Sequence, residues 1–240
     1  MSALTSLRRT LAAPVPPELR HQLWLTARAA PAALHFRKIP DQPLNRLLEG
    51  VDEAPLTIQH RFRPRALPYG EAYVLSLICA HVQPQRIFEL GTAGGEGTLL
   101  LLRQAPDARV DTLDLGEGAQ SSLGIQPGDA PLAESSVGAA FRDTELSARI
   151  TQHLGDSARF DYTPFAGIMD LIFIDGAHTY DYALADSRAA LGMVAAGGVV
   201  VWDDCHLRHA GVPRALAQLR EEGYDIVRVT GTRLALLRMR

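Results

Sequence analysis

Several features that mark particular classes of protein are scarce or missing in this 240-residue sequence. With only two cysteines, Cys79 and Cys205, it cannot build a disulfide framework, and we expect a reducing, cytoplasmic setting. No apolar run approaches the ~20 residues that span a membrane, and no signal peptide is predicted. A formal net charge of −3 leaves no basic footprint for nucleic acid. The hydrophobic content of 47% instead predicts a globular protein with a substantial core.

Proline is unevenly spread, and its distribution predicts the domain organisation. Nine prolines fall within the first 68 residues, whereas Pro84 is the only one between Tyr69 and Arg103. Each proline removes a backbone donor and restricts the residue before it, so we expect residues 1–66 to form an arm of short helices and extended segments. Residues 67–240 are expected to form the main domain, which opens with a helix over 70–82.

Beyond that helix, candidate strands and helices alternate, which predicts an α/β fold with a mostly parallel sheet and helices on both faces. The last two strands are joined by a short turn around Gly231, so one edge of the sheet should be an antiparallel hairpin. The remaining expected helices are 96–104, 179–192 and 209–222. The seven expected strands are 86–90, 109–114, 149–154, 170–175, 198–203, 224–229 and 233–238.

Residues 116–147 interrupt this alternation with a stretch that is rich in glycine, serine and alanine. The stretch is too long for a plain connector, and long excursions from a compact sheet are usually functional lids or disordered loops. The sequence leaves both interpretations of this insertion open.

The sequence IFELGTAGG at 87–95 is the most informative local pattern. A β-branched and aromatic run leads into Gly91, Gly94 and Gly95 and then into an apolar run, which is the order of a strand, a tight turn and a helix. In an open parallel sheet, ligands bind outside the carboxyl ends of the strands, and glycine lets them approach the backbone. The pattern therefore predicts a nucleotide-like pocket at this turn.

The spacing of the glycines does not fit a dinucleotide. The fingerprint G-x-G-x-x-G cannot start at Gly91 or at Gly95, because Ala93 and Leu100 occupy positions that require glycine. An acid such as Glu89 suits a cationic ligand and would repel a pyrophosphate. The whole pattern, Glu-x-Gly-x-x-x-Gly, resembles that of Rossmann-like S-adenosylmethionine-dependent methyltransferases.

This resemblance implies a site for S-adenosylmethionine along the strand ends. Asp114, at the end of the second strand, would accept hydrogen bonds from the ribose hydroxyls. Asp156 and Ser157, after the third strand, would face the adenine, although Asp156 could equally cap a helix. The methionine end of the cofactor would be held by the turn residues Glu89, Gly91, Thr92, Ala93 and Gly95.

The ends of the fourth and fifth strands carry further chemistry. The segment Asp175-Gly-x-His178-x-Tyr180 resembles a subgroup of these enzymes that methylates hydroxyls of sugars and natural products. Asp203 and Asp204 end the next strand, so three carboxylates should meet at one sheet edge, where they repel one another unless they are protonated or metal-bound. Oxygen ligands of this kind suit Mg²⁺.

The three carboxylates also resemble the metal site of catechol-type O-methyltransferases. That resemblance implies that Asp175, Asp203 and Asp204 hold the metal and that Asp175 also adjoins the cofactor. It further implies that His178, three residues after the first acid, is the catalytic base, with Asp175 as its partner in catalysis. Helix capping and solvated charge are the alternative explanation of the aspartate pair.

Other residues near this edge are less specific. His206 and His209 follow the aspartate pair and are either additional ligands, in a softer site for Zn²⁺ or Mn²⁺, or plain loop residues. Cys205 has no nearby pattern that supports nucleophilic catalysis, and Trp202 is expected to pack in the sheet.

The function that the resemblance implies is Mg²⁺-assisted transfer of a methyl group from S-adenosylmethionine to a hydroxyl of a small molecule or sugar. The arm and the insertion would roof the pocket and select this acceptor. We expect no nucleic-acid or membrane partner, and homo-oligomer formation is left open. Two alternatives remain: a NAD(P)-dependent oxidoreductase, which the glycine spacing disfavours, and a non-catalytic methyltransferase-fold binding module, which the cluster of like charges disfavours.

Overall fold

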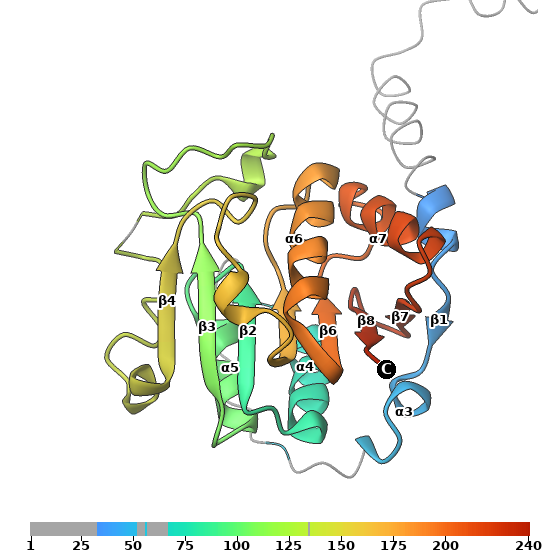
Figure 1. Ribbon diagram of the computed structural model, residues 1–240, viewed down its shortest axis with the longest axis horizontal. Helices are drawn as coiled ribbons and strands as arrows, with labels where there is room; N and C mark the ends of the chain where they lie inside the picture. Colours follow the sequence, from blue (N-terminus) through green and yellow to red (C-terminus); the bar gives the residue numbers. More distant parts are fainter. Residues whose placement is uncertain (1–32, 52–55, 57–66, 134) are drawn as a thin grey trace, which may run out of the picture.

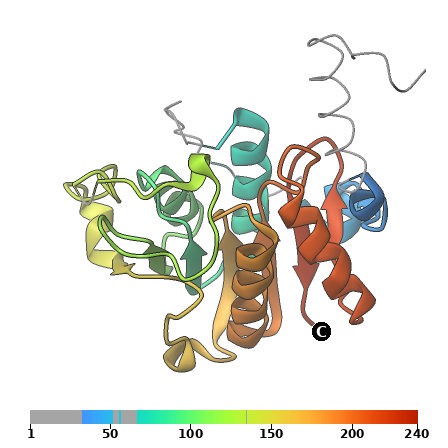
Figure 2. The same cartoon turned by 90° about the horizontal axis from the view of Figure 1, so that it is seen from above.

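The computed structural model describes residues 33–51, 56, 67–133 and 135–240. These residues form an eight-stranded sheet in the order β1-β7-β8-β6-β5-β2-β3-β4 (Figure 1). Helices cover both faces of the sheet, as the view from above shows (Figure 2). The predicted α/β class is therefore confirmed. Within the described part of the chain, we find no helix with the length and apolar character needed to cross a membrane.

The parallel part of the sheet contains the strands whose carboxyl ends were predicted to carry the site. It consists of β2 (Arg86–Leu90), β3 (Arg109–Asp114), β4 (Ile150–Leu154), β5 (Met169–Ile174) and β6 (Val194–Trp202). Beyond β6, the predicted hairpin forms: β8 (Ala235–Arg238) pairs antiparallel with both β6 and β7 (Val227–Val229).

An additional strand comes from the predicted arm. β1 (Asp41–Gln42) pairs parallel with β7, so the hairpin is not the outermost edge of the sheet as expected. The N–H of Arg228 donates to the carbonyl of Pro40 at 2.8 Å, and that of Thr230 donates to Gln42 at 2.9 Å. A two-residue strand between prolines has no alternation that a sequence could reveal. Residues 1–32, 52–55 and 57–66 of the predicted arm lie outside the described residues.

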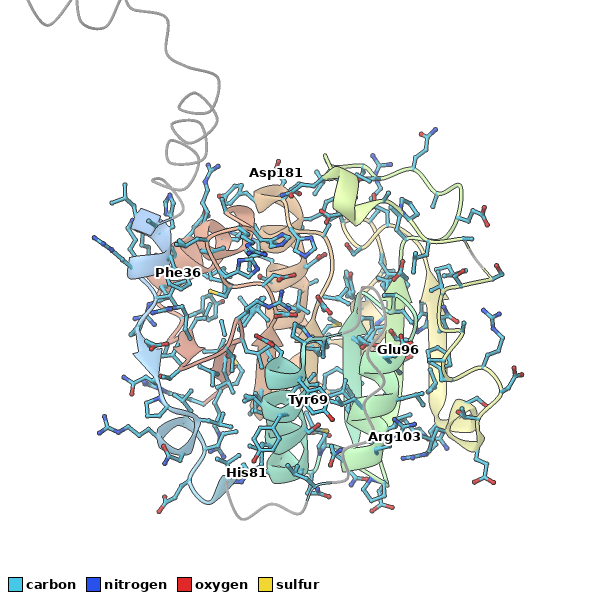
Figure 3. The ribbon with its side chains drawn as sticks, turned by 180° about the vertical axis from the view of Figure 1, so that it is seen from behind. Phe36, Tyr69, His81, Glu96, Arg103 and Asp181 are labelled. Atoms are coloured by element: carbon cyan, nitrogen blue, oxygen red, sulfur yellow. The ribbon has the colours of Figure 1, made fainter. Side chains whose placement is uncertain are left out.

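The two faces of the sheet carry separate cores because successive strand side chains point in opposite directions. Ile87 of β2 packs in the core under α4 (Tyr69–Val82) and α5 (Glu96–Gln104), to which the short α3 (Leu44–Leu47) also contributes. Phe88 packs in the opposite core, under α6 (Tyr180–Met193) and α7 (Gly211–Glu221). Figure 3 shows α4 and α5 from behind, with Tyr69 and Glu96 at the ends nearer the candidate site.

The insertion at 116–147 passes over the carboxyl ends of β2 and β3 (Figure 1). Among its described residues, η2 (Pro127–Asp129) is a 3-10 turn, and a second such turn, η3 (Glu145–Arg149), begins at its end and leads into β4. The N–H groups of Gly138 and Ala140 donate to the carbonyl oxygens of Ala93 and Gly94, at 2.9 and 2.8 Å. The insertion is thus joined by backbone hydrogen bonds to the turn that was predicted to hold a cofactor.

Candidate active site

A cavity of about 300 Å³ lies at the carboxyl ends of the parallel strands. One wall comes from the insertion, through Ile125 and residues 128–132, and an apolar patch comes from Leu67 and Pro68. Many of the predicted site residues line this cavity: Gly91, Ala93, Asp114, Asp156, Ser157, Asp175, His178, Asp203 and Asp204. The fold therefore brings together groups that are spread over more than a hundred residues of sequence.

The glycine turn between β2 and α5 is shaped by close packing of backbone and side chains. Gly91 has a φ of +99°, and a Cβ at this position would overlap the carbonyl oxygen of Asp175. Gly95 has a φ of +90°, and a Cβ there would press into the ring of Phe141 from the insertion. Both positions need glycine because a side chain would collide with neighbouring protein atoms. Gly95 in particular lies beneath the insertion.

Glu89 and Thr92 support this turn from below. The carboxylate of Glu89 is buried and accepts hydrogen bonds from the hydroxyls of Thr98 at 2.5 Å and Thr112 at 2.7 Å. Burial raises the pKa of Glu89 to about 7, against the opposing effect of these two donors. The hydroxyl of Thr92 pairs with that of Thr112. Contact of Glu89 with a cationic ligand stays a prediction, and the position of the side chain does not favour it.

Asp114 and Asp156 both line the cavity and both hold loops in place. Asp114 accepts the N–H of Ala93 at 2.8 Å, and Ala93 has a positive φ of 44°. Asp156 accepts the N–H of Ser122, from the insertion, at 2.8 Å and the hydroxyl of Tyr182 at 2.9 Å. Burial alone would raise the pKa of Asp156, but these donors outweigh it and lower the pKa.

Three carboxylates converge where β5 and β6 end, as the sequence predicts. One oxygen from each of Asp175, Asp203 and Asp204 lies within 4.8 Å of the others. Burial raises the pKa of Asp175 well above its usual range and that of Asp203 to about 6, and repulsion between the carboxylates adds to both shifts. Asp204 behaves differently: hydrogen bonds from His178 and His206 outweigh burial and lower its pKa.

Arg233 pairs with two of these carboxylates, and the sequence analysis missed it. Its guanidinium reaches Asp203 at 3.0 Å and Asp204 at 3.0 Å, while its backbone N–H donates to Glu71 at 3.1 Å. The strand pairing of the hairpin does indicate this contact. Because β8 runs antiparallel to β6 and pairs Ala235 with Trp202, the residues just before β8 must lie beside those just after β6.

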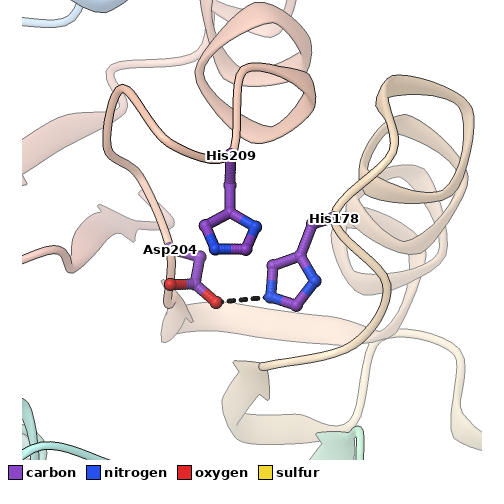
Figure 4. Close-up of side chains that lie close together, drawn as sticks. All are labelled: His178, Asp204 and His209. Atoms are coloured by element: carbon purple, nitrogen blue, oxygen red, sulfur yellow. Dashed lines mark hydrogen bonds and ion pairs between the residues drawn. The ribbon is translucent and has the colours of Figure 1, made fainter. Parts of the chain in front are cut away.

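His178 lies between two carboxylates from different parts of the chain. Its Nε2 is 2.5 Å from an oxygen of Asp204 (Figure 4), and its Nδ1 bonds to Asp129 from the insertion. Burial alone would lower the pKa of His178, but the two carboxylates raise it to about 10. In this arrangement both ring nitrogens hold a proton. Asp129 was also missed, because nothing in the insertion's sequence marks it as a partner.

The neighbouring histidines complete the surroundings of Asp204. The Nε2 of His206 is 3.1 Å from Asp204, and the ring centroid of His209 is 3.9 Å from that of His178. His209 faces the same carboxylate (Figure 4). Trp202 packs in the core as expected, with its indole N–H on Ser187 at 2.9 Å. Burial raises the pKa of the Cys205 thiol to about 12, so a thiolate nucleophile is disfavoured.

Comparison with protein families gives a match to the central part of the chain. The family model described as a methyltransferase domain matches residues 88–205, from β2 to the residue after the aspartate pair. Among the curated proteins, none matches this chain.

Solved structures of methyltransferases share the fold. The O-methyltransferase TomG from Streptomyces achromogenes, in complex with SAM, is 23% identical over 73% of this chain and 82% of its own, with a TM-score of 0.54. The SAH-bound methyltransferase PaMTH1 from Podospora anserina is 17% identical over 95% of this chain and 97% of its own, with a TM-score of 0.57. The O-methyltransferase from Bacillus cereus in complex with SAH is 18% identical over 74% and 84%, with a TM-score of 0.53. At these identities the likeness establishes the fold.

Proposed function

We propose that this chain is an S-adenosylmethionine-dependent methyltransferase that methylates a hydroxyl group of a small molecule. The match of residues 88–205 to a methyltransferase domain supports this proposal. One observation carries this proposal: Asp175, His178, Asp203 and Asp204 converge on the cavity that the glycine turn also lines. An acceptor hydroxyl needs a proton acceptor beside the methyl donor, and this edge of the cavity supplies candidates. The apolar patch of Leu67, Pro68, Ile125 and Leu132 suits the carbon body of a small acceptor.

The cofactor would lie along the carboxyl ends of β2, β3 and β4. The backbone at Gly91 and Ala93 would hold the methionine end, and Asp156 with Ser157 the adenine. Asp114 already accepts one hydrogen bond from Ala93, and a carboxylate can accept more from ribose hydroxyls. TomG and the Bacillus cereus enzyme, which were solved with SAM and SAH, support this choice of ligand.

The chemical step is an in-line displacement. The acceptor oxygen would attack the sulfonium methyl group, forming a carbon–oxygen bond while the carbon–sulfur bond breaks and S-adenosylhomocysteine leaves. The hydroxyl proton would pass to Nε2 of His178. Because Nε2 carries a proton and binds Asp204 in the structure, that proton has to pass to Asp204 or to solvent, and the acceptor hydroxyl has to replace Asp204 at Nε2, before Nε2 can accept a proton. Asp175 lies at the same edge and would help to orient the acceptor.

The carboxylate cluster fits a hard divalent cation. Asp175, Asp203 and Asp204 offer oxygen donors within 4.8 Å of one another, and loss of solvation, with added repulsion from the other two carboxylates, raises the pKa of Asp175. A bound cation would relieve this repulsion. Arg233 balances part of this charge through Asp203 and Asp204, and its side chain is about one-third exposed, so it has room to move away. When bound, Mg²⁺ would lower the pKa of the acceptor hydroxyl.

The role of His178 can be tested by substitution. His178→Ala should lower kcat by about 10²–10⁴-fold, the usual effect of removing a general base, while affinity for S-adenosylhomocysteine stays the same. Transfer of the methyl group from labelled S-adenosylmethionine to a panel of phenols and sugars measures kcat. Calorimetry measures the affinity for S-adenosylhomocysteine. His81→Ala, at the far end of α4 (Figure 3), is the control. A His178→Ala enzyme with unchanged kcat would show that another group takes the proton.

A further inference from the structure

We propose that Asp129, supplied by the insertion, is a positioning residue that orients the imidazole of His178 for proton transfer. This inference rests on the proposed role of His178. Asp129 comes from η2, 49 residues before His178 in the sequence, and belongs to none of the motifs that predicted the site. It contacts the base at the ring nitrogen opposite the one that binds Asp204, and it lines the cavity.

The contact between the two residues uses both carboxylate oxygens. Oδ1 of Asp129 bonds to Nδ1 of the His178 ring, and Oδ2 accepts the backbone N–H of His178 at 3.0 Å. The Asp129 side chain is only 4% exposed, against 20% for the His178 ring. Because Asp129 bonds to both the ring and the backbone of His178, it fixes the rotation of the His178 side chain and keeps a proton on Nδ1. Nε2 is then the nitrogen left to face the acceptor.

Asp129 is itself held in a defined turn. Its backbone N–H donates to the carbonyl of Gln126 at 2.9 Å, and the side-chain amide of Gln126 donates to the carbonyl of His178 at 3.5 Å. The segment 126–129 therefore contacts His178 at its ring, its N–H and its carbonyl. Such a set of contacts specifies one orientation of the base, which general-base catalysis requires within a few tenths of an ångström.

The same insertion also contacts residues that were predicted to hold the two ends of the cofactor. The N–H of Ser122 donates to Asp156 on the adenine side, and Gly138 and Ala140 donate to the glycine turn on the methionine side. Asp129 lies between these attachments in the sequence. The segment that orients the base is thus the one that is attached to both parts of the predicted cofactor site.

The kinetic test compares Asp129→Asn with wild type. An asparagine has one acceptor oxygen where His178 presents two donors, so the ring or the backbone loses its partner. We expect kcat to fall about 10–100-fold, as for other groups that orient a functional histidine, with KM and S-adenosylhomocysteine affinity unchanged. Asp143→Asn, an exposed acid of the same insertion, is the matched control. Unchanged kcat, or a fall in kcat matched by lost cofactor affinity, would overturn the proposal.

Two further measurements separate this inference from the proposed function. In a His178→Ala background, Asp129→Asn should cause no additional loss, and a second independent loss would show that Asp129 acts elsewhere. Nitrogen NMR of labelled histidines should show the Nδ1 proton of His178 ordered in wild type and lost in Asp129→Asn, whether or not any acceptor is methylated. An identical His178 signal in both proteins would refute the contact itself, whereas an inactive wild type with the expected signal would refute only the proposed function.

Discussion

At the scale of single residues, position decides what an acid does. Glu89 sits at the end of β2 in the pattern that suggested a cationic ligand, yet its carboxylate is buried between the hydroxyls of Thr98 and Thr112. Gly97 explains why it fits, because a Cβ at that position would stand 2.7 Å from a Glu89 oxygen. The sequence places an acid at the strand end but does not say to which side of the glycine turn its side chain folds.

The buried state of Glu89 gives the fold a pH dependence. Its pKa in the folded chain, about 7, lies above the ordinary value of 4.5, so the folded state binds this proton more tightly. The resulting stabilisation is complete below pH 4.5 and is lost as the pH rises to about 7, by at most about 3 kcal/mol. Glu89→Gln should remove this loss.

Urea unfolding of wild type and Glu89→Gln at pH 5 and pH 7.5 measures the effect. Between pH 5 and pH 7.5, the unfolding free energy of wild type should fall relative to that of Glu89→Gln. Asp186, whose pKa burial also raises to about 7, is present in both proteins and cancels in the comparison. Parallel pH dependences in the two proteins would mean that Glu89 is ionised across this range.

At the scale of elements, the sequence was a good guide wherever a buried apolar run ends at a turn signal. β2, β3 and α5 have the predicted bounds. β2 ends before Gly91, α5 begins after Gly95 and ends shortly before Pro106, so glycine and proline mark these boundaries in the sequence. β1 was missed because two residues make no pattern. Asp129 and Arg233 were missed because their partners are distant in sequence, although the pairing of β8 with β6 contained the signal for Arg233.

The turn after β2 should be intolerant of any side chain at Gly91. Gly91→Ala should destabilise the fold by about 1–2 kcal/mol for the left-handed backbone and by about 1–3 kcal/mol more for overlap with the Asp175 carbonyl. Gly118→Ala is the matched control, because Gly118 has a φ of +74° but open space around it. Chemical unfolding of both variants measures the difference. Equal losses at the two positions would show that the turn can move away from β5.

At the scale of the whole molecule, one sheet edge collects groups from every part of the main domain. The glycine turn follows β2, Asp114 ends β3 and Asp156 follows β4, while the other carboxylates follow β5 and β6. The parallel topology could be predicted from the alternation of elements, and so could this convergence. The insertion was expected to roof the pocket, but its attachments could not be predicted, because hydrogen bonds from Ser122, Gly138 and Ala140 to distant loops leave no periodic trace in sequence.

The central claim is that this sheet edge is a cofactor site for the methyl donor, and calorimetric titration with S-adenosylhomocysteine tests it most directly. The account predicts one site per chain in wild type, clearly weaker binding in Asp114→Ala, and no binding of NADH. Asp111→Ala is the control, since Asp111 lies on the same strand but pairs with His153 at 2.8 Å. Binding of NADH without S-adenosylhomocysteine, or equal S-adenosylhomocysteine affinity in wild type and Asp114→Ala, would contradict it.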